Sequence, residues 1–290
     1  MVLWFRCNEI IPGTSLGILF IAVILGIYFL QLEFSGFPAK DRICRMASNY
    51  TENLEQFKEE KHKAFVVGYT GEVGKELVKQ LANSNLYEKV VLIGRREVPP
   101  EKIHGVEFEQ RVVDFEKLDE HADAFSDLDV GYCCLGTTKG KAGADGFVKV
   151  DFDYVLSVGQ TAKSKGCKHF SLVSSQGANK DSAILYTRIK GQIEEALKNL
   201  QFNRLSVFRP GVIMCEREES RPVEAVARTL LKPIAFFFPT AMTTPVGYVA
   251  TSMINNALSK TEKTYELYEN KAIHELAKMA EAPKGCKSKK

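Results

Sequence analysis

The sequence predicts an α/β fold, a doubly wound parallel sheet with helices on both faces, preceded by an N-terminal transmembrane helix. Two observations predict the sheet. Short apolar runs alternate with helical patterns from residue 63 onwards, and a glycine-rich turn directly follows the first run. The third observation is the uncharged, strongly apolar stretch at residues 10–32, which is long enough to cross a bilayer as a helix.

Composition divides the chain into five parts. Residues 1–9 form a short tail, residues 10–32 the membrane anchor and residues 33–62 a polar connector. Within and just beyond the connector, Asn49–Lys63 is rich in Glu and Lys and indicates a surface helix or a hinge. Residues 63–282 form the α/β domain, and residues 283–290 form a basic tail that is typical of a solvated chain end.

The charges around the apolar stretch predict its orientation. Arg6 and Glu9 offset each other before it, whereas Lys40, Arg42 and Arg45 follow it. The positive-inside rule then places the large C-terminal part in the cytosol. We therefore expect a single-pass protein of an intracellular membrane, and a cytoplasmic protein is the alternative. A cleaved signal peptide is disfavoured because the apolar run is long and no convincing cleavage site follows it.

Net charge and cysteine usage exclude several functions. The formal net charge of +3 gives no basic surplus, so no direct binding of nucleic acid is expected. The 7 cysteines are odd in number and form no CxxC pair, so neither a metal site nor a disulfide framework is expected, and a reducing compartment fits. Cys133 and Cys134 are adjacent in an apolar run, which predicts two small buried side chains on opposite faces of a strand.

The glycine-rich turn begins where the apolar run Ala64–Val67 ends. Gly68, Gly71 and Gly74 follow at a GxxGxxG spacing, and Lys75–Ala82 has a helical pattern. Gly68 allows a sharp turn, Gly71 allows the backbone to approach a diphosphate, and Gly74 allows the helix to lie close to the strand. The helix N-terminus would then face the anion. An ordinary strand-to-helix loop is the alternative for this turn taken alone.

The remaining apolar runs give the predicted order of strands. They are Val90–Ile93, Phe108–Val113, Val130–Leu135, Phe170–Val173 and Leu205–Phe208, with helical patterns at Gly146–Lys165 and Leu185–Leu200. Strands that alternate with helices predict right-handed crossovers and a parallel sheet. The glycine turn then lies at the point where the strand order reverses, which is where such sheets bind dinucleotides.

Two arginines end the second strand and predict the kind of dinucleotide. NAD-binding folds usually carry an acidic residue there for the ribose 2′-hydroxyl, but this chain has Arg95 and Arg96. Guanidinium groups suit a 2′-phosphate, which favours NADPH; two solvated loop arginines are the alternative. Asp114, after the third strand, could accept a hydrogen bond from the adenine amino group or cap the following helix, and both remain open.

The fourth and fifth strands supply candidates for the chemistry. Leu135 and Gly136 end the fourth strand, where Gly136 would let the chain approach the cofactor's ribose and diphosphate. Ser174 and Ser175 end the fifth strand, and a serine there can orient a carbonyl and stabilise a developing alkoxide.

The YxxxK pattern follows the serine pair. If this segment is helical, Tyr186 and Lys190 lie one turn apart on one face. An ammonium beside a phenol lowers the phenol pKa towards working pH, and it can also hold the nicotinamide ribose. Because YxxxK occurs by chance in many helices, its value here lies in its position after the fifth strand.

Eight segments carry a resemblance to the atypical branch of the short-chain dehydrogenase/reductase superfamily. They are GYTGEVG, VVLIGRR, VVDFEKLDE, DVGYCCLGTTKGKAGADGFVKVD, CKHFSLVSSQGANK, LYTRIKGQIE, FRPGV and ENKAIHEL. The resemblance extends from about Lys63 to near Ala280. It implies a Rossmann-like domain that binds NADPH. Members of this family are also described as regulators in transcription, nuclear import and apoptosis, which implies possible protein partners.

The resemblance also assigns residues. It implies that Tyr186 and Lys190 are the catalytic pair. The implied cofactor-binding residues are Thr70, Gly71, Glu72, Val73, Arg95, Arg96, Leu135, Gly136, Ile213 and Arg221. The chain departs from the family pattern at its apolar N-terminus, which argues against a nuclear or freely cytosolic role, and it is less similar between Glu216 and Thr244.

Two functional hypotheses follow from these residues. The first is an NADPH-dependent reductase of a small carbonyl compound, in which Tyr186 donates a proton, Lys190 lowers its pKa, and Ser175 or Ser174 polarises the carbonyl. The second is an NADPH-binding regulatory module that acts through protein partners with little or no turnover. The Ser/Tyr/Lys set favours the first, because a pure binding module has no need of an activated phenol.

Overall fold

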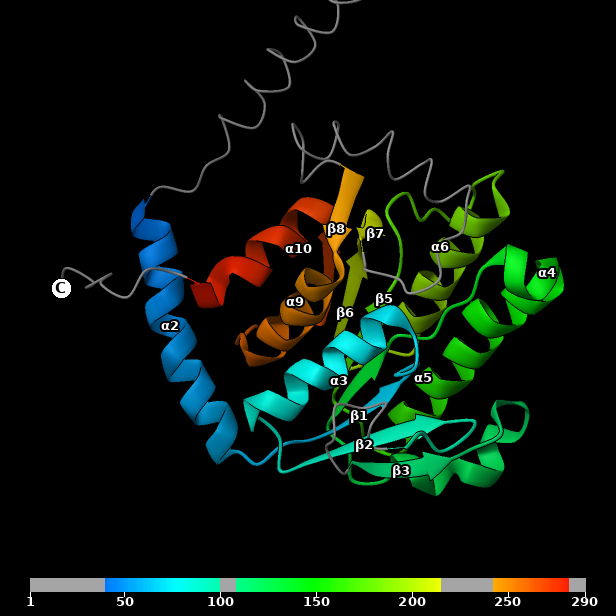
Figure 1. Ribbon diagram of the computed structural model, residues 1–290, viewed down its shortest axis with the longest axis horizontal. Coiled ribbons are helices and arrows are strands. Elements are labelled where there is room, and N and C mark those ends of the chain that lie inside the picture. Colours follow the sequence, from blue (N-terminus) through cyan, green and yellow to red (C-terminus); the bar gives the residue numbers. More distant parts are fainter. Residues whose placement is uncertain (1–39, 100–107, 215–241, 282–290) are drawn as a thin grey trace, which may run out of the picture.

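A parallel sheet of seven strands forms the centre of the chain (Figure 1), in the order β3-β2-β1-β4-β5-β6-β9. The computed structural model describes residues 40–99, 108–214 and 242–281. The strands are β1 (Lys63–Val67), β2 (Lys89–Gly94), β3 (Glu109–Val112), β4 (Val130–Cys133), β5 (His169–Val173), β6 (Arg204–Arg209) and β9 (Tyr265–Glu269). A separate parallel pair joins β7 (Val212–Met214) to β8 (Thr243–Pro245).

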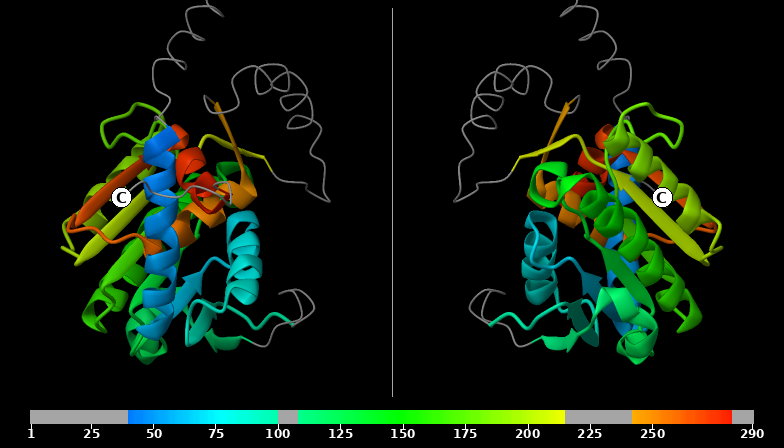
Figure 2. Two further views of the ribbon diagram at one scale, coloured as in Figure 1. Left: turned by 90° about the vertical axis from the view of Figure 1, so that its left-hand side faces the viewer. Right: turned by 90° about the vertical axis from the view of Figure 1, so that its right-hand side faces the viewer.

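Helices cover both faces of the sheet (Figures 1 and 2). One face carries α3 (Glu72–Ser84), α9 (Val246–Leu258) and α10 (Asn270–Ala277), with α2 (Lys40–Glu59) and η4 (Lys278–Glu281) beyond them. The other face carries η2 (Phe115–Phe125), α5 (Val155–Ser164) and α6 (Leu185–Lys198), with α4 (Lys139–Val148) and the π-helix η3 (Lys149–Tyr154) leading into α5. The predicted Rossmann-like doubly wound sheet is confirmed.

Strand β1 is apolar from Ala64 to Val67 because helices cover both of its faces. Ala64 and Val66 point into the core under α3 and α9, whereas Phe65 and Val67 point into the core under α5 and α6. Each is completely buried. Since both faces of the strand are covered, no position is left for a polar side chain, and each large apolar side chain contributes about 1.5–3 kcal/mol by leaving water.

The strand order reverses between β1 and β4. Ala64 lies opposite Val90 of β2 on one side and opposite Val130 of β4 on the other, and both pairings are parallel. The carboxyl ends of β1, β2 and β4 therefore meet at one edge of the sheet, directly before the predicted glycine turn, the two arginines and Leu135. This is the edge at which doubly wound sheets bind ligands.

Six of the seven strands of the sheet correspond to the predicted apolar runs, although β3 is shorter than its run. The prediction missed β9, whose sequence YELYE includes two charged residues and lies at the sheet edge. It also missed α9, which is apolar nearly all round because it lies between α3, α10 and the sheet. Cys133 and Cys134 face opposite cores, as expected, and burial raises the pKa of the Cys133 thiol to about 12.

The described part of the polar connector is helix α2, which packs on the domain. Phe57 is buried against Tyr87, and the Tyr50 hydroxyl donates to Asn255 of α9 at 3.1 Å. The predicted anchor at residues 10–32 and the basic tail at residues 283–290 lie outside the described residues. Among the helices that the structure does describe, none combines the length and the apolar character needed to cross a membrane.

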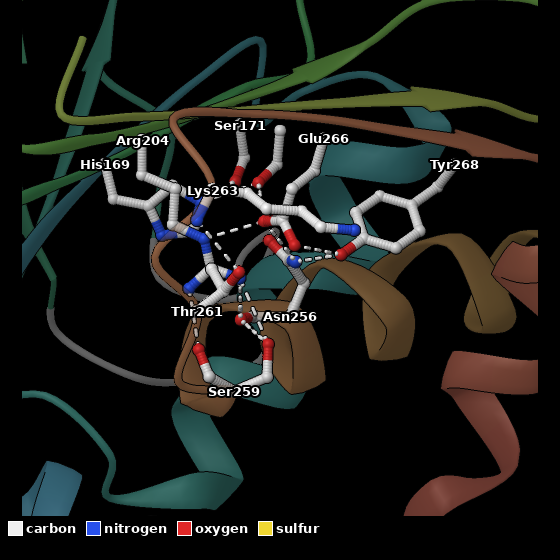
Figure 3. A network of polar contacts seen from close by, with 10 residues as sticks. His169, Ser171, Arg204, Asn256, Ser259, Thr261, Lys263, Glu266 and Tyr268 are labelled. Carbon is white, nitrogen blue, oxygen red and sulfur yellow. Dashed lines mark hydrogen bonds and ion pairs between the residues drawn. The ribbon is translucent and has the colours of Figure 1, made fainter.

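A buried polar network lies at the amino ends of β5, β6 and β9 (Figure 3). Arg204 pairs with Glu266 at 2.8 Å and donates to the carbonyls of Ser259 and Asn256 at 2.8 and 2.9 Å, at the C-terminal end of α9. Burial would raise the pKa of Glu266, but the Arg204 charge and hydrogen bonds from Tyr268, Arg204 and Asn256 hold it below its ordinary value. One guanidinium thus joins two strands to the C-terminus of α9.

We expect Arg204→Ala to destabilise the fold by about 3 kcal/mol or more, because it leaves the Glu266 carboxylate buried without its partner. Urea unfolding followed by circular dichroism would measure the loss. The matched control is Arg111→Ala at the exposed edge strand β3, where the guanidinium side chain is 53% exposed. The control should change the free energy of unfolding by less than about 0.5 kcal/mol. Equal losses in the two variants would contradict this account of Arg204.

Candidate cofactor and catalytic site

The glycine turn has the tight geometry that its spacing predicts. Gly68 has a φ of +77°, and a Cβ atom there would lie 2.5 Å from the carbonyl of Cys134. A Cβ atom at Gly74 would lie 2.3 Å from the Gly68 carbonyl oxygen, so only glycine lets α3 start this close to β1. Gly71 is the N-cap residue of α3 and brings no side chain to the cap, so the first amides of the helix stay open at the sheet edge.

A cavity of about 410 Å³ opens beside this turn. Its lining residues come from the ends of three neighbouring strands and from the start of η2, and they are Gly68, Tyr69, Thr70, Ile93, Gly94, Arg95, Arg96, Phe115 and Leu135. Five of the predicted cofactor residues, Gly68, Thr70, Arg95, Arg96 and Leu135, are therefore brought together. Glycine backbone, arginines and aromatic rings form much of the wall, and they fit the adenosine and phosphate groups of a dinucleotide.

Not every predicted cofactor residue lines the cavity. The Val73 side chain is buried in the core, so only its backbone is on the turn. Glu72 begins α3 and pairs with Lys75 at 4.0 Å. Asp114 accepts a hydrogen bond from the Glu116 amide at 2.9 Å and caps η2, which is the second of the two alternatives for this residue. Ile213 lies on β7, and Arg221 lies outside the described residues.

Two residues without a motif of their own hold the arginine turn. The Tyr69 ring packs against Gly94, where a Cβ atom would lie 2.8 Å from it, and the Tyr69 hydroxyl donates to the Arg96 carbonyl at 2.9 Å. The Gln110 amide exchanges two hydrogen bonds of 2.8 Å with the backbone of Val98. Both contacts fix the backbone of the turn and leave the arginine side chains exposed.

The arginines are available to an anion. Neither Arg95 nor Arg96 forms an ion pair within residues 40–99, 108–214 and 242–281. Arg95 lies close enough to Tyr154 to act on its pKa, which is raised first by burial and then by a hydrogen bond to Glu116. Tyr154 stacks on Phe115 with ring centroids 5.4 Å apart. A cationic turn thus adjoins an aromatic wall, an arrangement suited to a phosphorylated nucleoside.

The YxxxK pair lies on α6, as the pattern predicts. Lys190 is buried, and its ammonium lies 2.8 Å from Oδ1 of Asp151, which is also buried. A Cβ atom at Gly136 would come within 3.8 Å of the Lys190 ammonium, so the lysine lies directly behind the loop that follows β4. Tyr186 is 42% exposed, and its ring stacks on Phe147 with centroids 5.6 Å apart.

The two serines at the end of β5 have different surroundings. Ser174 is buried and donates to Glu194, which also pairs with Arg209. Ser175 is partly exposed and donates to the Gln176 carbonyl at 3.3 Å. The Ser174 hydroxyl is therefore engaged in a hydrogen bond to the buried carboxylate of Glu194, whereas Ser175 is the more accessible of the two serines.

Comparison with known proteins agrees with this geometry. The profile of the NAD(P)H-binding family matches residues 68–226. The rat protein HTATIP2, a Tat-interactive protein, is 50% identical over 230 residues, which cover 79% of this chain and 95% of the relative. The mitochondrial protein FMP52-1 of Scheffersomyces stipitis is 32% identical over 225 residues, which cover 74% and 98%.

Solved structures show the same fold at low identity. A putative NAD-dependent epimerase/dehydratase from Bacillus halodurans aligns with a TM-score of 0.56 and 20% identity, over 74% of this chain and 99% of that chain. The expected resemblance to the atypical short-chain dehydrogenase/reductases is confirmed, and the chain belongs to the NAD(P)H-binding family, as a relative of the Tat-interactive protein HTATIP2.

Proposed function

We propose that the protein is an NADPH-dependent oxidoreductase that reduces a small carbonyl compound. The observation that carries the proposal is the buried Lys190 ammonium behind Gly136, one helical turn from Tyr186, at the sheet edge where the glycine turn opens. NADPH would supply a hydride to the carbonyl carbon. The glycine turn and the first amides of α3 would hold its diphosphate, and Arg95 and Arg96 its 2′-phosphate.

The side chains around Tyr186 support acid catalysis. Stacking on Phe147 holds the ring in place, and Tyr186 is exposed enough for a substrate to reach the residue. Tyr186 would give its proton to the carbonyl oxygen as the hydride arrives, and Lys190 would stabilise the phenolate left behind. Ser175 is the better placed of the two serines to donate to the same oxygen, because Ser174 is bound to Glu194.

The cofactor preference is the first test of this proposal. We expect NADPH to bind at least about tenfold more tightly than NADH, or about 1.4 kcal/mol. Arg95→Ala or Arg96→Ala should remove most of the difference, because the remaining contacts are common to both cofactors. Fluorescence titration with each cofactor would measure it. Equal affinities in the unaltered protein would contradict the assignment.

Two further variants sharpen that titration. Tyr69→Phe keeps the ring against Gly94 and removes the hydroxyl, which donates to the Arg96 carbonyl at 2.9 Å and lies 3.5 Å from Oε1 of Gln110. It leaves both guanidinium groups in place, so it should weaken the preference less than loss of a guanidinium. The control is Lys168→Ala, whose 69% exposed side chain pairs with Asp129 at the opposite edge of the sheet. It removes a positive charge without touching the cavity and should leave the preference intact.

The chemistry is tested at Tyr186. Tyr186→Phe keeps the ring that stacks on Phe147 and removes the transferable proton. We expect NADPH affinity to stay nearly unchanged while turnover of a carbonyl substrate falls by about 10²-fold or more. Tyr265→Phe, at the amino end of β9, is the matched loss of a hydroxyl far from the site. Full activity of Tyr186→Phe on a confirmed substrate would eliminate this mechanism.

A regulatory module is the second candidate, and kinship with a Tat-interactive protein favours it. In that case the same fold would bind NADPH, and the cofactor would control contact with a protein partner. Tyr186→Phe would then leave partner binding unchanged, and no carbonyl in a broad panel would be reduced.

We further propose that residues 10–32 anchor the protein in an intracellular membrane with the domain in the cytosol. The full chain should pellet with membranes and resist carbonate extraction, because its uncharged stretch suits the bilayer core. Removal of residues 1–39 should release a domain that still binds NADPH, since it leaves every described residue in place. The fractionation should include mitochondria, since the relative FMP52-1 is named as a mitochondrial protein. A full chain released by carbonate would contradict the anchor.

A further inference from the structure

Asp151 lies where the predicted catalytic lysine meets the predicted cofactor loop. Its Oδ1 atom is 2.8 Å from the Lys190 ammonium, and its Oδ2 atom accepts a hydrogen bond of 2.7 Å from the backbone amide of Thr137. Thr137 directly follows Leu135 and Gly136, the end of β4 that adjoins the cavity. A single carboxylate therefore links α6 to the loop after β4.

Asp151 is buried within the π-helix η3. Phe147, Asp151 and Val155 are each 1% exposed and are spaced four residues apart across the junction of α4, η3 and α5. Residues at this spacing lie on one face of a helix, so Asp151 belongs to the face that packs inwards. A carboxylate buried beside Phe147 and Val155 is costly without a partner.

Asp151 is only partly satisfied by the protein. Its Oδ1 atom is buried, and the Lys190 ammonium at 2.8 Å is the one partner of that atom among the described residues. Lys190 in turn has three N–H donors, and Asp151 is its one ion-pair partner among the described residues. Asp151 engages one of these donors, and the others remain available to a ligand.

We propose that Asp151 is the positioning residue of the site: it keeps Lys190 charged and couples the lysine to the loop that holds the cofactor ribose and diphosphate. This inference rests on the proposed function in that the coupled loop is assigned to NADPH. The pairing itself is independent of the substrate.

The groups that face Lys190 support a charged state. They are Asp151 from η3, Tyr186 from its own helix and the thiol of Cys133 from β4, whereas Glu194, one turn further along α6, is tied to Arg209 and Ser174. Burial by itself lowers the pKa of Lys190, but the Asp151 carboxylate, helped by Tyr186, more than offsets this and holds the pKa above its ordinary value.

The direct test is the titration of Lys190 followed by NMR of labelled lysine side chains, with Lys190→Met to assign the signal. In Asp151→Asn the ammonium stays buried but loses its counter-charge, so Lys190 should titrate at lower pH than in the unaltered protein. Asp153→Asn is the matched control, since Asp153 is exposed in the same π-helix. An unchanged Lys190 titration in Asp151→Asn would overturn the proposal.

Cofactor affinity measured across the same pH range tests the coupling. NADPH binding to Asp151→Asn should weaken by about fivefold or more as Lys190 loses its proton, because a hydrogen bond from a charged donor is stronger than one from a neutral donor. The unaltered protein and Asp153→Asn should show no such step. Failure of the unaltered protein to bind NADPH would refute the proposed function, and the lysine titration would still decide independently whether Asp151 keeps Lys190 charged.

Folding of the variants gives the remaining control. If Asp151→Asn does not fold, the double variant Asp151→Asn with Lys190→Met decides, because it leaves no buried charge unpaired. A folded double variant would show that Lys190 requires its counter-charge and would support the proposal. An unfolded double variant would overturn it, since Asp151 would then serve only to hold the backbone at Thr137.

Discussion

The close approach of the β1 turn to the end of β4 is the constraint on which the site depends. Gly68 lies so near the Cys134 carbonyl that any side chain would overlap it, and Gly74 lies equally close to Gly68. These contacts bring the start of α3 to the point where the strand order reverses. The open amides of that helix, the arginine turn after β2 and the loop after β4 therefore surround one cavity. A bulkier residue at Gly68 or Gly74 would force these elements apart and remove the site with the turn.

The sequence alone predicted the parts of the site that depend on residues close together in the chain. Glycine spacing, apolar runs and the YxxxK pattern each depend on residues a few positions apart, and all were found where the patterns predicted. The sequence did not reveal the residues that hold these parts of the site in place. Tyr69, Gln110 and Asp151 act through contacts with residues distant in the chain, and no sequence pattern assigned a role to any of them.

The two serines at the end of β5 show the same limit of prediction from sequence. Alternation along a strand predicts that Ser174 and Ser175 face opposite ways, but it does not say which faces the substrate. The structure separates them by their partners, since Ser174 donates to Glu194 while Ser175 stays partly exposed. The sequence also left two roles open for Asp114, because capping the following helix and binding adenine would both use the carboxylate after β3. In both cases the structure shows a hydrogen bond inside the protein that the sequence did not reveal.

The sheet has a buried ion pair at each end, and the two pairs differ in how far their hydrogen-bond donors are used within the protein. Arg204 meets Glu266 and the terminal carbonyls of α9, so its rigid fork of donors is used within the protein. Lys190 pairs with Asp151 alone among the described residues, and its ammonium lies beside Gly136 in the loop that follows β4. Replacing a buried pair by apolar residues is often neutral or stabilising, so stability does not account for a pair that stays half satisfied. Under the proposed function, the hydroxyls of the cofactor ribose would complete the lysine's hydrogen bonds, which would give the pair a role that stability does not explain.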